Sequence, residues 1–319
     1  MAGFTLRPLS ATDLDEVCVL HNAAYRHDGS PMVMEVEELA EELDDEHVVF
    51  ATDTMAAEAD GSIVGYAYTY HLPSEVREER CYVFGIVHPQ HRRAGVGTAL
   101  MQWGLRRATE QVLSSSSSLP GFVRTDVSDT ITDAHRVFDT LGMTPVRYMD
   151  ELLRPLTDLP PLTSVDGVRI VPWPDDRDEE IRTEKNISFE QHWGSTPTSA
   201  HHWQQMVRGY GARPDLSFVA LDPDDRVIGH CLNKRFPADD DLLGRMDAWI
   251  DNLGILPQWR GRGVGSALIA ASLHAFAAEG LTHASIGVDS ENPSGAAQLY
   301  RALGFRTNLR SITQQLQVR

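Results

Sequence analysis

One short segment occurs twice in this chain, and it constrains the fold more than any other feature of the sequence. Residues 256–268 read Leu-Pro-Gln-Trp-Arg-Gly-Arg-Gly-Val-Gly-Ser-Ala-Leu, and residues 88–100 read His-Pro-Gln-His-Arg-Arg-Ala-Gly-Val-Gly-Thr-Ala-Leu. The two copies lie about half the chain apart, which is typical of an internal duplication. We therefore expect two halves that share one fold.

The second copy joins an apolar run that ends at Ile255 to a helical pattern that starts near Val264. A glycine-rich turn between a strand and a helix leaves backbone N–H groups unobstructed at the positive end of the helix dipole, where phosphate groups bind well. The segment matches neither the P-loop pattern of nucleotide hydrolases nor the G-x-G-x-x-G dinucleotide pattern. It therefore predicts an anion-binding turn of another kind.

Arg260, Gly263 and Gly265 match R/Q-x-x-G-x-G/A, so the turn resembles the pyrophosphate loop of the GNAT superfamily of N-acetyltransferases. Residues 286–305 resemble a second signature of that family: a strand, an Asn turn, and a helix with Tyr300 just ahead of Leu-Gly-Phe. The resemblance extends over essentially the whole chain. It implies an α/β protein of two tandem GNAT folds, each with a mixed sheet, and acetyl-CoA as the co-substrate.

Duplication and resemblance together divide the chain into three segments. We expect an N-terminal GNAT domain at 1–154, a proline-rich linker without periodicity at 155–167, and a C-terminal GNAT domain at 168–319. Each half follows the order strand, two helices, three strands, helix, strand, helix, strand. The expected elements include strands at 48–52 and 63–70 with a hairpin turn before the second, and a helix at 292–303.

The two halves differ at positions that carry chemistry. Aligning the glycine loops places Asp251 opposite Val83, and aligning the last helices places Tyr300 opposite Phe138. The first half therefore keeps the loop and lacks the ionisable groups. We expect a catalytic C-terminal half and a degenerate N-terminal half, and the sequence leaves open whether the first half still binds coenzyme A.

The resemblance implies transfer of an acetyl group from a thioester to an amine. A carboxylate, or a water chain that ends on one, would take the proton of the amine. Asp251 is the first candidate for this base, and Asp247 and Glu190 are the alternatives. Tyr300 matches the family's acid, which protonates the departing thiolate.

The remaining candidates bind rather than react. A backbone N–H near Leu253 or Gly254 would stabilise the oxyanion. The coenzyme-binding candidates of the second half are Leu253, Gly254, Ile255, Arg260, Gly261, Arg262, Gly263, Val264, Gly265, Ser266 and Asn292, and those of the first half are Arg92, Arg93, Gly95, Val96, Gly97 and Thr98. Candidates for the wall of the acceptor pocket, or alternatively for the core, are Phe189, His192, Trp193, His201, His202 and Trp203.

Composition excludes several classes of function. The net charge is −18, with 46 acidic and 28 basic residues, which disfavours binding to nucleic acid or to an anionic membrane and suits a cationic acceptor. The sequence shows neither a membrane-spanning run nor a signal peptide. Its three cysteines are isolated, so we expect reduced thiols, a cytoplasmic protein and no metal site.

These features predict an acetyl-CoA-dependent N-acetyltransferase that acts on a primary amine of a small molecule. The layout also resembles mycothiol synthase, which acetylates the cysteinyl amine of a sugar–inositol conjugate, although an antibiotic amine, an amino sugar or a polyamine fits the acidic charge equally well. A non-catalytic acyl-CoA sensor or scaffold is the alternative from another class. For the oligomeric state, both a homodimer and a monomer whose halves imitate the family's dimer fit the sequence.

Overall fold

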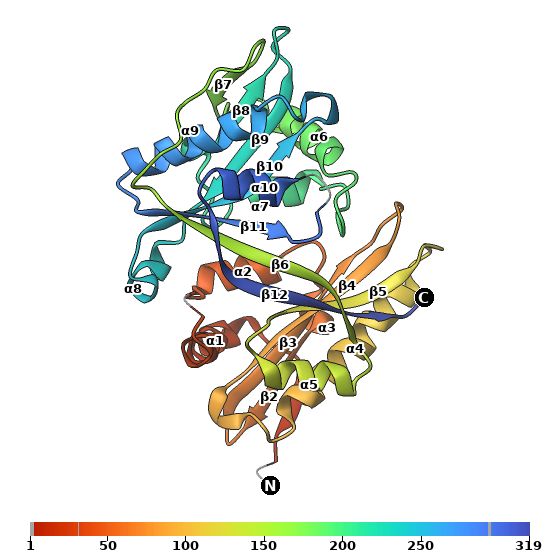
Figure 1. Cartoon of the computed structure of the whole chain (residues 1–319). Helices are drawn as coiled ribbons and strands as arrows, with labels where there is room; N and C mark the ends of the chain where they lie inside the picture. Colours follow the sequence, from red (N-terminus) through yellow and green to blue (C-terminus); the bar gives the residue numbers. More distant parts are fainter. Residues whose placement is uncertain (1–2, 31, 293–294) are drawn as a thin grey trace. The chain divides into compact units, whose positions relative to one another are not determined.

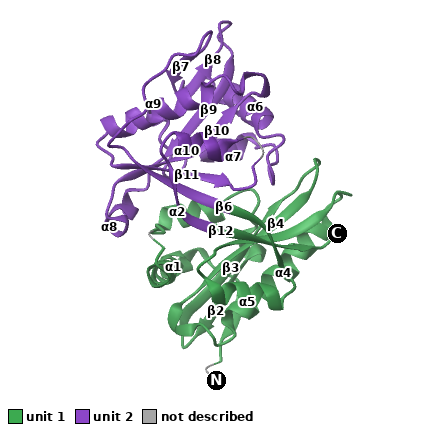
Figure 2. Ribbon diagram, in the orientation of Figure 1, with its two compact units in different colours: residues 1–148, 311–319 green, residues 149–310 purple. Residues whose placement is uncertain are grey.

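The computed structural model describes residues 3–30, 32–292 and 295–319 (Figure 1). The chain forms two compact units, coloured separately in Figure 2. Unit 1 comprises residues 1–148 and 311–319, and unit 2 comprises residues 149–310.

Each unit contains most of the last strand of the other sequence half. Strand β6, Thr144–Pro155, pairs antiparallel with β11, His283–Asp289, from Met149 onward and so completes unit 2. Strand β12, Arg306–Gln317, pairs antiparallel with β5, Gly121–Ser128, from Ser311 onward and so completes unit 1. Both β6 and β12 accordingly change colour along their length in Figure 2. The units therefore differ from the linear division into 1–154, 155–167 and 168–319, which stays a prediction about the sequence repeats.

Unit 1 is a mixed sheet in the order β1-β2-β3-β4-β5-β12, in which β4 and β5 run parallel. Helix α1 packs on one face against β3 and β4, and α4 packs on the other face. Besides β5 and β12, its strands are β1 Thr5–Arg7, β2 Thr54–Ala59, β3 Ser62–Leu72 and β4 Glu79–Val87, and its helices are α1 Leu14–Asp28, α2 Val36–Leu43, α3 Phe50–Asp53, α4 Val96–Ser114 and α5 Thr132–Thr140.

Unit 2 repeats this arrangement in the order β6-β11-β10-β9-β8-β7, in which β10 and β11 run parallel. Its further strands are β7 Arg169–Pro172, β8 Phe218–Leu221, β9 Val227–Lys234 and β10 Asp247–Ile255, and its helices are α6 Asp178–Ser188, α7 Ala200–Arg208, α8 Asp240–Leu243, α9 Val264–Ala278 and α10 Ala296–Ala302. The order of elements in both halves confirms the predicted α/β fold of two repeats.

Helices α6 and α9 cover opposite faces of the sheet of unit 2. Successive side chains of a strand point to opposite faces, and on β9 Cys231 contacts Ser272 of α9 whereas the neighbouring His230 contacts Glu184 of α6. Helix α9 is apolar and largely buried, so it forms the centre of the core. Leu156 of the predicted linker is buried in the same core.

Two local predictions differ from the structure or extend beyond its described residues. The strand expected at 48–52 is wrong, because Asp53 accepts a hydrogen bond from the backbone N–H of Val49 at 2.7 Å and fixes a helical turn, α3, before β2 begins at Thr54. The hairpin turn between β2 and β3 is confirmed, with Asp60 and Gly61 at φ 52° and 78°. The helix expected at 292–303 includes residues 293 and 294, which lie outside the described residues, and α10 starts at Ala296.

Candidate active site

The central strands β10 and β11 of unit 2 pair over only part of their length. Their parallel register runs from Asp247 opposite His283 to Ile250 opposite Ile286. Beyond this point β10 pairs with β9 and β11 pairs with β6, while β10 continues to Ile255 and β11 to Asp289. The two strands therefore diverge and leave an opening at the end of β10 that leads into the glycine loop.

Backbone groups of β10 face this opening. The N–H of Leu256, the residue after β10, donates to the carbonyl of Ile228 of β9 at 3.0 Å. In an antiparallel pair, alternate residues direct both backbone polar groups to the same neighbour, so Gly254 also faces β9. Leu253 and Ile255 face the side of β11. Of the two N–H groups proposed for the oxyanion, only that of Leu253 therefore points to the opening.

Asp251 is the extra residue of a β-bulge. Ile250 pairs with Asn233 and Asn252 pairs with Leu232, so Asp251 has no partner position on β9. The corresponding strands of unit 1, β3 and β4, pair through this region without a shift. The alignment of Asp251 with Val83 is therefore wrong, because the residue is inserted. A bulge redirects a side chain, and Asp251 is exposed, with one oxygen 3.7 Å from Nζ of Lys234.

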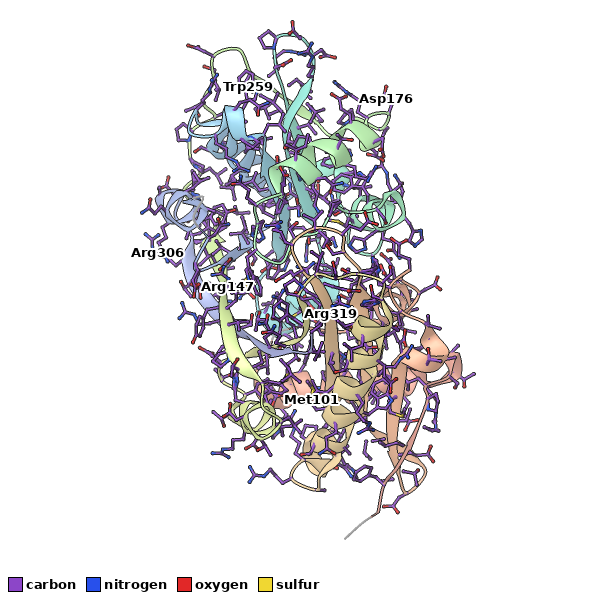
Figure 3. All side chains as sticks on the ribbon, turned by 90° about the vertical axis from the view of Figure 1, so that its right-hand side faces the viewer. Met101, Arg147, Asp176, Trp259, Arg306 and Arg319 are labelled. Carbon is purple, nitrogen blue, oxygen red and sulfur yellow. The ribbon has the colours of Figure 1, made fainter. Side chains whose placement is uncertain are left out.

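The glycine loop holds its backbone in left-handed conformations at the start of α9. Gly261 and Gly263 have φ of 72° and 88°, and α9 starts at Val264. A side chain at Gly261 would meet no heavy atom within 4 Å, so space is open above the loop. The first helical turn, which includes Gly265 and Ser266, presents N–H groups without intrahelical partners, as any helix start does. Next to the loop, the guanidinium of Arg262 lies over the ring of Trp259, the residue labelled in Figure 3.

Arg260 connects the loop to two other elements. Its Nε donates to the carbonyl of Ile255 at 3.0 Å, and its Nη2 donates to the carbonyl of Ser188 at the end of α6 at 2.6 Å. The side chain therefore fixes the loop against β10 and α6.

Tyr300 lies on α10 with its ring packed near Phe305. The side chain is buried, and burial, reinforced by the nearby Cys231, raises the pKa of the phenol well above its ordinary value. No described residue forms a hydrogen bond with its hydroxyl. A phenol that stays protonated and keeps its hydrogen available can donate a proton to a leaving group.

The other candidate bases differ in position. Asp247 is buried at the start of β10, where it accepts a hydrogen bond from Ser285 at 3.0 Å and lies 3.3 Å from Arg245. Glu190 is exposed beyond the end of α6. Asn292, the coenzyme candidate after β11, donates its backbone N–H to the carbonyl of Asp289 at 3.0 Å. Of the two carboxylates on β10, Asp251 lies nearer to the opening than Asp247 does.

The expected acceptor wall is divided between core and surface. Trp203 is buried, and its ring lies at 88° to that of His230. Phe189 lies beneath the ammonium of Lys185, whose pKa burial lowers to about 8. His201 is exposed, while His192, Trp193 and His202 lie partly buried on or before α7.

A buried polar cluster was missed by the sequence reasoning. Glu184 of α6 contacts Nδ1 of His230, and Nε2 of His230 lies 2.8 Å from Oδ1 of Asn252. Ser188 also donates to Glu184. A glutamate on the apolar stripe of α6 and a histidine inside an apolar strand were the available signals, since such residues need a partner when buried.

The loop of unit 1 has the same backbone with different partners. Arg93 and Gly95 have φ of 64° and 88°, and α4 starts at Val96, followed by Gly97 and Thr98. Arg92, the counterpart of Arg260, donates to the carbonyl of Val87 at 3.2 Å but places its Nη atoms 2.6 and 2.8 Å from the two carboxylate oxygens of Asp28.

The described residues contain no group of three or more His, Cys, Asp or Glu side chains arranged to hold a metal ion. They also contain no helix with the length and apolarity needed to cross a membrane.

The sequence profile of the Acetyltransferase (GNAT) family matches this chain twice, at residues 14–142 and 179–305. The chain belongs to the GNAT acetyltransferase family. It is therefore an acyltransferase, and the two matches confirm that it is a tandem repeat of the family's domain.

Two curated relatives match this chain over most of their own length. The chain is 30% identical over 309 residues to the mycothiol acetyltransferase of Saccharomonospora viridis, with 94% of each chain covered. It is 29% identical to the mycothiol acetyltransferase of Mycolicibacterium smegmatis, with 93% of each covered. Among solved structures, a tandem GNAT protein from the clavulanic acid biosynthesis pathway shares the fold at a TM-score of 0.74 and 17% identity, with 99% of both chains covered.

Proposed function

We propose that this protein transfers the acetyl group of acetyl-CoA to a primary amine of a small molecule, and that the reaction takes place in unit 2. The observation that carries the proposal is the diverging end of β10 and β11, which brings together an N–H of Leu253, the bulge at Asp251 and the glycine loop. Together these groups meet the requirements of acyl transfer: a base, an oxyanion donor and an anion cradle.

Asp251 acts as the base. An ammonium ion has no lone pair, so the acceptor must lose a proton before its nitrogen attacks the thioester carbonyl. The bulge turns an exposed carboxylate out of the regular strand, where it can take this proton directly or through water. The N–C bond then forms as the carbonyl oxygen becomes an oxyanion.

Leu253 and Tyr300 act on the following steps. The Leu253 N–H, directed away from β9, donates to the oxyanion, and a fixed donor at this position stabilises the transition state strongly. As the C–S bond breaks, the hydroxyl of Tyr300 donates its proton to the thiolate. The phenol is protonated at neutral pH even at its ordinary pKa of about 10, and burial raises the pKa of Tyr300 further, so the proton is present when the thiolate leaves.

The loop from Arg260 to Ser266 fits a diphosphate. Its open space at Gly261 and the first turn of α9 offer backbone N–H groups and a favourable dipole. Acetyl-CoA supplies the diphosphate and the activated acetyl group as co-substrate. Asn292 and the backbone of residues 253–255 are the further proposed contacts.

For the acceptor we propose an amine of the kind that mycothiol synthase acetylates, the cysteinyl amine of a sugar–inositol conjugate. The full-length similarity to two mycothiol acetyltransferases supports this choice over an amino sugar or a polyamine. The net charge of −18 suits a cationic amine in general.

The test measures release of the free thiol of coenzyme A from acetyl-CoA. The purified protein is offered the cysteinyl sugar–inositol conjugate, glucosamine, spermidine and no acceptor. We expect release with the conjugate above that with the other amines. Thiol release with one of the other amines but not with the conjugate would overturn the proposed acceptor. Binding of acetyl-CoA without thiol release for any amine would support the non-catalytic sensor instead.

A further inference from the structure

The cluster of Glu184, His230 and Asn252 is built into unit 2 beside the proposed reaction site, and the chemistry above does not use it. His230 is fully buried and Glu184 nearly so. The rings of Trp173 and Trp203 both stand edge-on to His230, at 90° and 88°. An ionisable pair at such a place is costly unless every polar atom has a partner.

The hydrogen bonds determine how the side chain of Asn252 is oriented. Nε2 of His230 faces Oδ1 of Asn252 at 2.8 Å, and an amide oxygen only accepts, so Nε2 carries the hydrogen and donates. On its other side, Nδ1 of the ring is hydrogen-bonded to Glu184, which also accepts a hydrogen bond from Ser188. With Oδ1 held by His230, the Nδ2 group of Asn252 is turned away from the ring.

The Nδ2 group is available to a ligand. Asn252 is partly exposed, and within the described part of the chain the only hydrogen bond of its side chain is the one to His230. The residue follows the bulge residue Asp251 directly. Its side chain lies on the α6 face of β10, together with that of His230, whereas α9 packs on the other face.

Gly254 completes the arrangement. A Cβ on Gly254 would lie 2.8 Å from Nδ1 of His230, still closer to Cε1, and 3.2 Å from Cβ of Ser188. The imidazole therefore occupies the space that any side chain at this position would require. In unit 1 the paired position of β4 carries Ile86, and Tyr66 of β3 replaces the histidine and bonds to His21 at 2.8 Å.

We propose that Asn252 contacts the acceptor substrate through Nδ2, and that Glu184 and His230 are positioning residues that hold its amide in the binding orientation. The acceptor then approaches from the α6 face, opposite α9, and carries a hydroxyl or carbonyl oxygen near its amine to accept this hydrogen bond. The proposal rests on the proposed function, because it assigns a specificity contact in the same site.

The test compares steady-state constants for Asn252→Ala, His230→Gln and the double variant, with acetyl-CoA and the cysteinyl sugar–inositol conjugate as substrates. Loss of one hydrogen bond should raise the KM for the conjugate about tenfold, with the Kd for acetyl-CoA, measured by calorimetry, within about twofold. Because His230 acts through Asn252, the double variant should be no worse than Asn252→Ala alone.

The control and the contrary outcomes are distinct. Tyr66→Phe removes the hydrogen bond between Tyr66 and His21 in unit 1. It should change neither the KM for the conjugate nor the Kd for acetyl-CoA. Glu184→Gln, which keeps the side-chain size, replaces His230→Gln if the latter is insoluble. An unchanged KM in Asn252→Ala, or additive effects in the double variant, would overturn this inference and leave the proposed function intact. A wild-type protein that acetylates no amine would overturn the proposed function and, with it, this inference.

Discussion

Arg92 and Asp28 form a two-fold hydrogen-bonded ion pair at the glycine loop of unit 1, with N–O distances of 2.6 and 2.8 Å. Arg260, at the same point of the loop in unit 2, instead donates to two backbone carbonyls. A carboxylate beside a diphosphate cradle repels the ligand it would bind, and it also neutralises the arginine. We infer that coenzyme A binds to the loop of unit 2 in preference to that of unit 1.

Calorimetric titration should therefore give one equivalent of acetyl-CoA per chain. Gly265→Glu should abolish this binding and lower activity by about 100-fold or more, since it adds negative charge and bulk to the first turn of α9, where a Cβ would already lie 3.4 Å from Leu299. Gly97→Glu is the matched control in unit 1, with a Cβ 3.5 Å from Val87. A stoichiometry of two, or loss of activity only in Gly97→Glu, would contradict the assignment to unit 2.

Tyr300→Phe should lower kcat by about 10²-fold to 10⁴-fold, the usual contribution of a general acid. The Kd for acetyl-CoA should stay the same, because the hydroxyl is needed only when the C–S bond breaks. Since no described residue bonds to that hydroxyl, its removal should also leave the melting temperature nearly unchanged. Stopped-flow thiol release and a thermal melt measure the two effects. Unchanged turnover would remove Tyr300 from the role of acid.

The fold was predictable from the sequence because its signals are local and repeated. The glycine loops, the short buried run of β9 and the apolar pattern of α9 determine strand, turn and helix without reference to the rest of the chain. The exchange of β6 and β12 was not predictable, since the pattern within a single strand does not specify which strand it pairs with. The strand wrongly placed at 48–52 shows the limit of the same argument, because one side-chain bond from Asp53 overrides an apolar run.

The site was predictable only in part, for a related reason. Spacing predicted the strand–turn–helix around Arg260 and the glycines and a helix at Tyr300, whereas the bulge at Asp251 follows from the pairing of two strands, which spacing cannot show. The Glu184–His230 pair joins residues of a helix and a strand that are distant in sequence. Each residue alone looks like an ordinary polar residue, and only the packing of α6 on β9 reveals the pair.

Asp251→Asn should reduce kcat/KM at neutral pH by about 10²-fold or more, because the amine then loses its catalytic base. The deficit should shrink as the pH rises towards the pKa of the acceptor amine, since a growing fraction of the amine is already deprotonated. A pH–rate profile of the variant and the wild type checks this convergence. Parallel profiles would assign the base elsewhere, and Glu190→Gln is then the next variant to measure.

Gly254→Ala should destabilise unit 2 by about 1–3 kcal/mol, the usual cost of overpacking a core. The methyl group would displace the ring of His230, which Glu184 and Asn252 hold on either side. Gly287→Ala on β11 is the matched control, because a Cβ there meets no heavy atom within 4 Å. Urea unfolding of the two variants measures the difference. Equal stability would mean that the ring moves at little cost.

Unit 1 should lose stability as the pH falls from 6.5 to about 4. Burial lowers the pKa of His21 from 6.5 to about 4 in the folded protein, so over this interval the unfolded chain binds a proton that the folded chain does not. Because the pKa of His21 is depressed in the folded protein, its neutral ring contributes fully to the stability of unit 1 above pH 6.5. This contribution is lost progressively as the pH falls below 6.5. At about 1.4 kcal/mol per pH unit, the full loss approaches about 3 kcal/mol.

Hydrogen exchange of the β3 amides near Tyr66, whose hydroxyl lies 2.8 Å from Nδ1 of His21, follows the stability of this unit across the pH series. His21→Gln removes the titrating group while keeping a side chain that can bond to Tyr66, so it should flatten the pH dependence by the same amount. His201→Gln, at an exposed histidine of unit 2, should leave the dependence as it is in the wild type. An equal slope in His21→Gln and the wild type would show that other groups of unit 1 carry the acid sensitivity.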